Sequence, residues 1–376
     1  RSDNLDDCYE RTDPSKKNRY GFRPSMVSRE YLSWPQITKL CLLQPSYGLM
    51  EKRGGALIDI NGERLKERMF RYYDKDVSWD GLKAEQHPLV RDAARFQAQK
   101  AREKVIFEEQ YDDMRLYRYL VRPLDLRWCY YSPVRPLWND ARPSLWRHHW
   151  RENGFLISRF KCSSDPEGIP FYWTSRLIDD HCLAPDAAAI PIWVQANVSK
   201  SNGSEKKLRV LRGLPSDIAT ANVSATTKDY LRMMGFLDPS IDADQAGIIW
   251  RHVLAIGFST EFLNENADGI REDWPRIPLP AERERLLQSA ELGRQVAELL
   301  DTETPVAGVT AGEIRPELRP VGVIERVDGR PVDPAAGDLD ITAGWGHAGQ
   351  GGVTMPGRGK LVATEFDAAG NPSAYG

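Results

Sequence analysis

The hydrophobic pattern of this chain changes its period twice, and this constrains the fold more than any other feature of the sequence. From Glu63 to Tyr73, apolar residues recur every three or four positions, which is the helical period. Between residues 117 and 194, short apolar and aromatic runs are separated by prolines, as is typical of short strands joined by loops. Helical spacing returns at 246–259 and 281–300. The succession predicts an α+β fold.

The same reading predicts individual elements. A second helix is expected over Pro88–Glu109, with its alanines and Val90 on one face. Short strands are expected near Leu57–Asn61 and at Phe155–Phe160, Phe171–Ser175, Ala189–Val194 and Val321–Val327. In the helix over 281–300, Gly293 lies within the apolar stripe. A glycine there costs about 1 kcal/mol of helix propensity, but it lets another backbone approach closely.

Length, cysteine content and hydropathy set broad limits. The 376 residues are enough for two or three domains. The five cysteines are widely spaced and none forms a C-x-x-C pair, so we expect no disulfide framework, no structural zinc and a reducing cytoplasm. No apolar run approaches the roughly 18 residues of a membrane span. Because the chain begins with Arg1 rather than Met, we expect a piece of a longer polypeptide.

Charge is distributed unevenly along the chain. Residues 115–212 hold 16 Lys/Arg against 9 Asp/Glu, a net charge of +7. Residues 1–114 are near balance at +1, and residues 213–376 carry −11. A basic middle can bind a polyanion locally while the whole chain stays near neutral. The alternative is that these basic residues only solvate a surface, and charge alone does not separate the two readings.

The middle third interleaves arginines with aromatic residues, a combination suited to phosphates, guanine edges and stacked bases. The loop Lys200–Arg212 is polar and basic, which makes it a candidate for phosphate contact. Asp125 and Arg127 are expected to form an ion pair that holds the fold, with Trp128 in the core, rather than to contact bases. The candidate nucleic-acid-binding residues are Arg135, Arg142, Arg147, Arg159, Arg176, Lys200, Lys206, Lys207, Arg209 and Arg212.

Catalytic and metal-binding patterns are weak. The glycine-rich block 344–352 lacks the Gly-Lys-Ser/Thr ending of a phosphate-binding loop and is interpreted as a tight loop. His181 follows Asp179 and Asp180, a set that can bind a hard metal, but a solvated turn is favoured and no metal is predicted. No Gly-x-Ser-x-Gly elbow and no cysteine with a neighbouring base occurs, so we predict no catalytic residues.

At this point the residues resemble a known family. The run Val121–Tyr131 (VRPLDLRWCYY) is similar to the signature that opens the specificity region of Type ISP restriction–modification enzymes and related large N6-adenine DNA methyltransferases. In that resemblance Arg122, Asp125, Arg127 and Trp128 are the structural signature. Four further stretches match in the family's order, and together they cover most of residues 55–360: Asp59–Met69, Tyr172–Leu177, Asp273–Pro280, and Gly344–His347 continuing through Met355–Lys360.

The resemblance implies a domain plan and a role. It predicts a helical connector over 1–114 after an absent methyltransferase domain, a target-recognition domain over 115–304 and a truncated strand-and-loop segment over 305–376. The partners implied are double-stranded DNA and the methyltransferase domain of the same polypeptide, with a cytoplasmic location. The parent enzyme would methylate adenine with S-adenosylmethionine; some relatives add nuclease and ATPase domains, and smaller ones in phage defence lack them.

Methyl transfer itself is not expected in this chain. An adenine methyltransferase carries an Asn-Pro-Pro-Tyr-like motif and a glycine-rich cofactor loop after a strand, whereas this sequence contains no Pro-Pro pair. We therefore expect no cofactor here and leave open whether the parent also restricts DNA. Two alternatives remain at this point. One is a self-contained hydrolase that uses acidic residues of the C-terminal third, and the other is a non-catalytic interaction module built on the eleven tryptophans.

Overall fold

The chain folds into two compact units, Arg1–Thr302 and Glu303–Gly376. The computed structural model describes residues 27–85, 88–93, 96–161, 168–183, 186–195, 219–241, 243–309, 311–313, 322–326, 330–331, 333, 335 and 359–363. In the second unit, β11 (Gly322–Arg326) pairs antiparallel with β12 (Gly359–Ala363). Within the described ranges, no helix is both long enough and apolar enough to cross a membrane.

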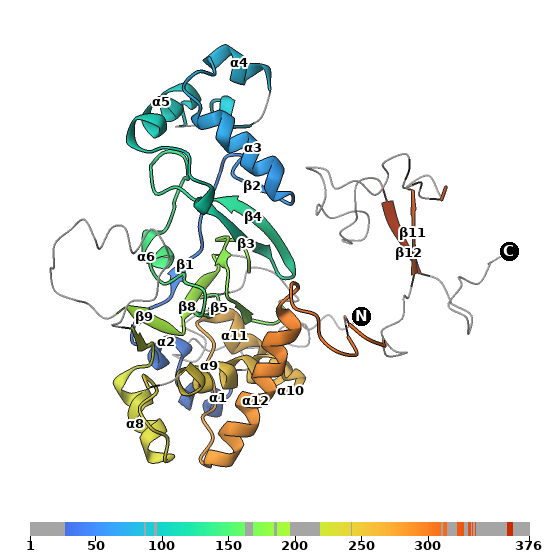
Figure 1. The fold of residues 1–376 in the computed structure, drawn as a ribbon. Coiled ribbons are helices and arrows are strands. Elements are labelled where there is room, and N and C mark those ends of the chain that lie inside the picture. Colours follow the sequence, from blue (N-terminus) through green and yellow to red (C-terminus); the bar gives the residue numbers. More distant parts are fainter. Residues whose placement is uncertain are drawn as a thin grey trace, which may run out of the picture. The chain divides into compact units, whose positions relative to one another are not determined.

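Two four-stranded sheets form the centre of the first unit (Figure 1). The first sheet is antiparallel throughout, in the order β1 (Ser46–Tyr47), β8 (Ala188–Pro191), β5 (Phe155–Ser158), β6 (Tyr172–Thr174). The second sheet is mixed, because its last pair is parallel, in the order β2 (Ile58–Asp59), β4 (Asp125–Tyr130), β3 (Leu116–Arg122), β7 (Leu177–Ile178). Mixed sheets with separate helices confirm the predicted α+β class.

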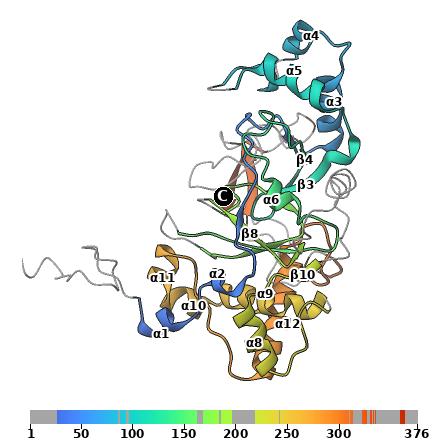
Figure 2. The same cartoon turned by 90° about the vertical axis from the view of Figure 1, so that its left-hand side faces the viewer.

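The first core lies between the second sheet and the helices near it. Helix α3 (Gly62–Tyr73) begins where the Asn61 side chain accepts hydrogen bonds from two backbone amides of the first turn. Its buried face packs with α5 (Ala98–Glu108), and the two helices lie side by side (Figure 2). The short elements α4 (Trp79–Ala84) and η3 (Pro88–Val90) connect them in sequence.

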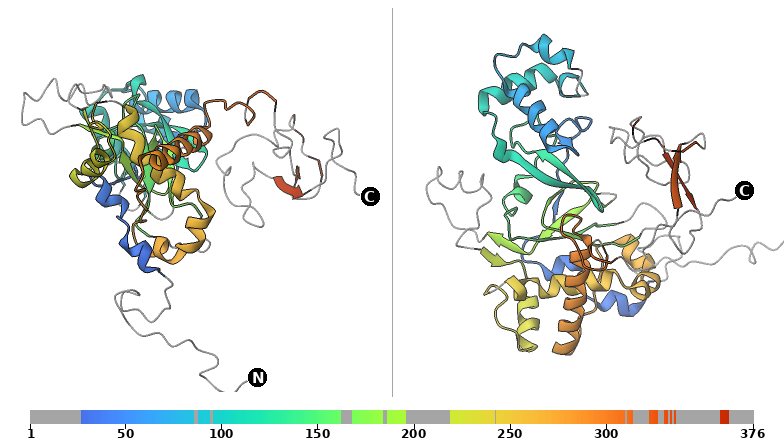
Figure 3. Two further views of the ribbon diagram at one scale, coloured as in Figure 1. Left: turned by 90° about the horizontal axis from the view of Figure 1, so that it is seen from below. Right: turned by 45° about the vertical axis from the view of Figure 1, so that its right-hand side comes forward.

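The second core is built on two helices, α9 (Ala243–Gly257) and α12 (Arg283–Leu300), which run side by side in every view (Figure 3). An added Cβ at Gly293 of α12 would lie 1.9 Å from the Arg251 carbonyl oxygen of α9, so the predicted close backbone approach is confirmed. The other helices in this half are α1 (Arg29–Ser33), α2 (Ile37–Leu40), α8 (Ala225–Met233), α10 (Thr260–Glu265) and α11 (Ala267–Glu272).

Two predicted elements were wrong in extent. The expected helix Pro88–Glu109 is interrupted, because Ala93 and Phe96 exchange backbone hydrogen bonds before α5 begins, and the Asp92 side chain accepts a bond from the Ala98 amide. The expected strand Ala189–Val194 is divided. Its second half is β9 (Trp193–Gln195), which leaves the first sheet and pairs with β10 (Ala219–Ala221).

The domain boundary expected at residue 114 is not visible as a break in the sheets. Strand β1 pairs with β8, and β2 pairs with β4, so segments from both sides of that position share each sheet. The division of the chain at 114 and at 304 stays a prediction. The glycine-rich block 344–352 lies outside the described residues.

Candidate nucleic-acid interface

The β3–β4 hairpin carries the signature residues, and its internal contacts hold the fold. Arg127 forks onto Asp125, with its Nε and Nη2 atoms 2.8 and 2.7 Å from the two carboxylate oxygens. Trp128 is partly buried against the first core, and its ring lies 4.8 Å from the Arg118 guanidinium carbon. The side chain also closes the space beside Gly62, at the start of α3. Trp128 therefore joins β4 to Arg118 of β3 and to the start of α3, while Asp125 and Arg127 form a local pair within β4.

Arg122, at the turn of the same hairpin, points outward. Its side chain is 52% exposed, and its Nη1 atom lies 3.6 Å from an oxygen of Asp179. The other oxygen of Asp179 accepts a hydrogen bond from the Tyr119 hydroxyl at 2.8 Å. Burial raises the pKa of Asp179 above its ordinary value. At 3.6 Å the ion pair is loose, and the Arg122 side chain is exposed, so its guanidinium can turn to another anion. Asp179 is only 15% exposed and also accepts the hydrogen bond from Tyr119.

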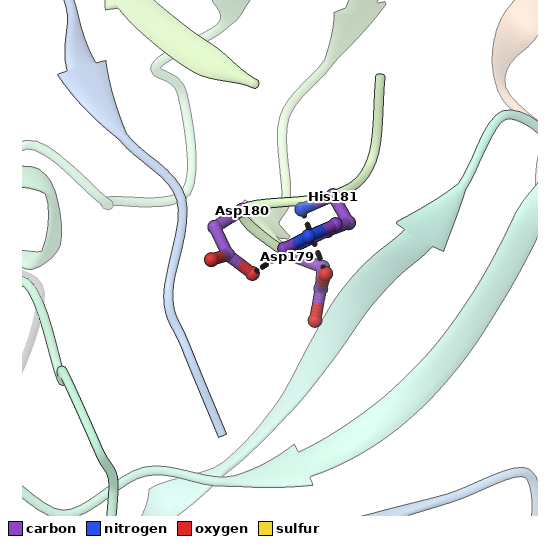
Figure 4. Close-up of side chains that lie close together, drawn as sticks. All are labelled: Asp179, Asp180 and His181. Carbon is purple, nitrogen blue, oxygen red and sulfur yellow. Dashed lines mark hydrogen bonds and ion pairs between the residues drawn. The ribbon is translucent and has the colours of Figure 1, made fainter. Parts of the chain in front are cut away.

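The turn Asp179–His181 lies between β1 and the β3–β4 hairpin (Figure 4). The ligand atoms of Asp179, Asp180 and His181 all lie within 4.8 Å of one another. They bond mainly to each other and to the hairpin: the His181 amide donates to Asp179 at 2.8 Å, and the His181 ring nitrogen Nδ1 lies 2.9 Å from Asp180. The Oδ2 atom of Asp180 is buried and has no hydrogen-bond partner among the described residues, and the expected absence of a metal stays a prediction.

Arg142 connects this turn to a second arginine. Gly48 packs so closely on Asp179 that an added Cβ would lie 2.5 Å from its backbone, and the Gly48 carbonyl accepts a hydrogen bond from Arg142 Nε at 3.2 Å. Arg142 also lies 2.9 Å from Asp140 and 5.6 Å from the Tyr47 ring centre. Its φ of +44° falls in the left-handed region, just before α6 (Pro143–Trp146). Arg142 is thus held firmly in place.

Arg135 is more exposed than Arg122 or Arg142. Its side chain is 66% exposed and lies 3.7 Å from the same Asp140 carboxylate that Arg142 contacts. Arg135 and Arg142 therefore share Asp140, and Arg142 is connected through Gly48 to Asp179, the partner of Arg122. We call this set the arginine strip: Arg122, Arg135 and Arg142 with Asp140 and Asp179. Two of its three cations are loosely paired and accessible to an anion.

The other candidate arginines differ in accessibility. Arg147 is exposed at the end of α6. Arg176 is partly buried, close enough to His149 that its charge adds to the effect of burial in lowering the pKa of that imidazole to about 4. Arg159 is 6% exposed, so its guanidinium lies among protein atoms and we leave it out of the interface. Lys200, Lys206, Lys207, Arg209 and Arg212 lie outside the described residues.

Trp146 of α6 packs in a cluster of aromatic rings. Tyr131 and Trp146 stack with ring centres 4.2 Å apart, and His149 stacks on the far side of Trp146 at 5.5 Å. Tyr117 meets the Trp146 ring edge-on at 4.6 Å. Tyr131 and Trp146 are almost completely buried, so their ring faces are not available to stack on a base in this conformation.

Sequence reasoning missed the acidic and aromatic partners in the strip. Asp140 and Tyr47 were not singled out, and Asp179 was considered only as a metal ligand. The spacing of Asp140 and Arg142, two residues apart in a loop, is a local signal for such a pair. Tyr47 and Gly48 carry no comparable signal, because they reach the arginines only through the tertiary fold.

The family and the fold of this chain are shared with known proteins. The family model described as the Type ISP C-terminal specificity domain matches residues 42–321. A search of curated proteins found none that matches. The cryo-EM structure of a DrdV–DNA complex is similar in fold, with a TM-score of 0.51 and 15% identity over 89% of this chain and 27% of that one.

Two further solved structures are similar at lower scores. A nuclease-deletion mutant of the Type ISP restriction–modification enzyme LlaGI, in complex with a DNA substrate mimic, matches with a TM-score of 0.47 and 13% identity over 80% of this chain and 25% of that one. The ATP-dependent Type ISP restriction-modification enzyme LlaBIII bound to DNA matches with a TM-score of 0.49 and 12% identity over 73% of this chain and 17% of that one. The chain thus spans about a quarter or less of LlaGI and LlaBIII. Because the family model covers more than half of the chain, this protein belongs to the family of Type ISP C-terminal specificity domains.

Proposed function

We propose that this chain is the DNA target-recognition region of a restriction–modification enzyme and that the arginine strip contacts the phosphates of duplex DNA. The observation that carries the proposal is the loose pairing of two exposed arginines, Arg122 and Arg135, with aspartates at 3.6 and 3.7 Å. Phosphate contacts position a protein on the duplex and supply most of its salt-sensitive affinity. Family membership and DNA in the structures of the three similar proteins support this role.

Within the arginine strip, Arg142 would position the loop, and Arg135 and Arg122 would bind phosphates. Arg142 is tied to Gly48, Asp140 and Tyr47, so it sets the position of the loop that carries Arg135. Arg135 and Arg122 would exchange Asp140 and Asp179 for phosphate oxygens when DNA binds. A guanidinium presents a planar fork of donors that suits a phosphate well, so each exchange would gain a charge-assisted contact.

Binding titrations over a range of salt concentrations test the proposal. The wild-type chain should bind a 40-base-pair duplex of mixed sequence with an affinity that falls steeply as salt rises. Arg135→Ala and Arg122→Ala should each weaken binding and lower the salt slope by about one unit, the loss of a single phosphate contact. The matched control is Arg285→Ala, which removes an arginine of similar exposure (71%) from α12. No salt-sensitive binding by the wild type would overturn the proposal.

We further propose that methyl transfer to adenine with S-adenosylmethionine lies in another part of the same polypeptide and that this chain presents the DNA to it. The residues of this chain would then bind the duplex and orient it toward the methyltransferase domain. Sequence of the coding region before Arg1 tests this directly. An Asn-Pro-Pro-Tyr motif within a few hundred residues supports the arrangement, and a complete open reading frame without one contradicts it.

The alternatives find little support in the described part of the chain. The tryptophans there are all buried or partly buried, so they offer no exposed coplanar faces to a sugar or a peptide. One surface depression of about 710 Å³ is lined by residues of α3 and of the turn before β3, in which acidic side chains stand beside Lys66, Phe70 and Tyr111. It does not lie in the C-terminal third, where a hydrolase site was considered. Hydrogen bonds from Tyr111 and Lys66 lower the pKa of Asp113 in that depression, which moves it away from the near-neutral value that suits a general acid.

A further inference from the structure

The turn of the β3–β4 hairpin has an unusual backbone conformation for the residue it carries. The turn is Arg122–Asp125, and the proline ring fixes φ of Pro123 near −65°. Leu124 follows with a φ of +64°. Proline followed by a residue of positive φ is the pattern of a type II turn, in which the second position is normally glycine or asparagine. A leucine there is strained by its Cβ.

The fold holds this strained residue in place from outside the turn. The Leu124 backbone amide donates a hydrogen bond to the Tyr172 hydroxyl at 3.0 Å. The same hydroxyl donates to the Leu300 carbonyl at the end of α12, also at 3.0 Å. Arg127 fastens Asp125 on the other side of the turn. These contacts involve the backbone of Leu124 or its neighbours, so none of them requires a leucine side chain.

The leucine side chain instead projects into solvent. Leu124 is 58% exposed, and Pro123 beside it is exposed as well. Local strain that the surrounding structure enforces, at a residue whose side chain has no role inside the fold, points to a role outside it. The rigid two-residue turn presents an apolar tip, next to the exposed cation Arg122.

We propose that Pro123 and Leu124 form a wedge that inserts between base pairs of bound duplex DNA, with Leu124 as the inserting side chain. Proteins that open a base step use leucine, proline and similar apolar side chains in this way, because the faces of unstacked bases are apolar. Arg122 would hold a phosphate beside the opened step. The inference rests on the proposed function, since it names a second mode of contact with the same DNA.

Two variants separate the wedge from the backbone. Leu124→Gly and Leu124→Asn both suit a positive φ, so each should melt at or above the wild-type temperature. Both should bind duplex DNA about fivefold or more weakly, with the salt slope unchanged, because the lost contact is apolar. The matched control is Leu292→Asn on α12, which removes a leucine of the same 58% exposure and should leave binding within twofold.

The experiment uses the 376-residue chain and a duplex whose adenines are replaced by 2-aminopurine in one strand. Binding is followed by anisotropy, and base unstacking by the rise in 2-aminopurine fluorescence. The wild type and Leu292→Asn should raise this fluorescence, and the two Leu124 variants should not. Thermal melting of every variant is measured alongside.

Any other result contradicts the wedge, and one of them contradicts the proposed function as well. Wild-type chain that shows no salt-sensitive binding overturns the proposed function and the wedge together. If it binds but both Leu124 variants match it in affinity and fluorescence, the wedge alone is wrong. Weaker binding with a lower salt slope would show that Leu124 acts through Arg122 and not by insertion. Melting of both variants well below the wild type would assign the side chain to the fold, which also contradicts the wedge.

Discussion

At the scale of single residues, the arginines of the β3–β4 hairpin and of the arginine strip are of two kinds. Arg127 is committed to Asp125 by two hydrogen bonds, and its side chain is 22% exposed. Arg122 and Arg135 have long ion pairs and side chains that are more than half exposed. The same residue type thus serves the fold in one case and is available to a ligand in the other. Pairing distance and exposure, not sequence, make the difference.

Replacing Arg127 with lysine tests its structural role. Lysine cannot fork onto both carboxylate oxygens, so Arg127→Lys should lower the free energy of unfolding by about 1 kcal/mol. Urea denaturation measures the change, and DNA affinity should remain near that of the wild type. Arg285→Lys, in an exposed pair of α12, is the control and should have no measurable effect. Unchanged stability with altered DNA binding would instead make Arg127 a contact residue.

One buried histidine, His148, and one partly buried histidine, His149, make stability depend on pH. Burial lowers the pKa of His148 and of His149 to about 4, with smaller contributions from Arg147 and Arg176 respectively. In the unfolded chain both titrate near 6.5, so the unfolded state binds more protons between about pH 6.5 and 4. The two histidines therefore leave the free energy of unfolding unchanged above pH 6.5. They lower it progressively as the pH falls from 6.5 toward 4.

The double variant His148→Gln, His149→Gln should reduce this dependence. Between pH 7.5 and 5.0 the wild type should lose more unfolding free energy than the variant does, by on the order of 4 kcal/mol, about half from each histidine. Urea titrations at the two pH values measure the difference. Equal losses in the wild type and the double variant would contradict the assignment.

At the scale of elements, the α9–α12 pair depends on one glycine. The backbones cross at Gly293, where an added Cβ would lie 1.9 Å from the Arg251 carbonyl oxygen. Leu286 and Ala290 are buried on the same helix, so the contact continues along the face. A methyl group at position 293 has no flexible neighbour to displace, and the two helices would have to move apart.

Gly293→Ala should therefore lower the free energy of unfolding by about 2–4 kcal/mol, despite the better helix propensity of alanine. Thermal or urea denaturation measures it. Gly247→Ala in α9 is the matched control, because the nearest atoms there belong to the flexible Arg251 side chain at 3.2 Å. That control should be neutral or slightly stabilising. Equal effects of the two substitutions would mean that the helices do not pack through Gly293.

At the scale of the whole molecule, residues up to Thr302 form one compact unit. Its two sheets draw strands from before and after residue 114, and α12 joins the second core to the Tyr172 hydroxyl near the hairpin turn. A unit connected in this way should unfold cooperatively without the residues that follow it.

A chain that ends at Thr302 tests this. It should unfold in a single transition with a melting temperature within a few degrees of the main transition of the 376-residue chain. Calorimetry provides the measurement, and the ratio of calorimetric to van't Hoff enthalpy checks cooperativity. A broad transition, or a large fall in melting temperature, would show that residues after Thr302 belong to the same folding unit.

Much of the architecture could be predicted from the sequence because it depends on local periodicity. The helix expected over 281–300 is α12, the helix expected over 246–259 is α9, and the close approach at Gly293 is confirmed. Extents were less predictable, since Ala93 and Phe96 pair with each other and interrupt a helical pattern. Where a local pattern competes with a tertiary contact, the contact decides.

Sequence alone therefore determined the α+β class, the family and the basic, aromatic character of the middle third. Only the tertiary structure decided which arginines face outward, because Tyr47, Gly48, Asp140 and Asp179 come together through non-local pairing. The conformation of Leu124 was likewise not visible in the sequence, where Pro-Leu-Asp reads as an ordinary turn. Periodicity sets which segments are helix or strand, while burial and ion pairing depend on neighbours that are distant along the chain.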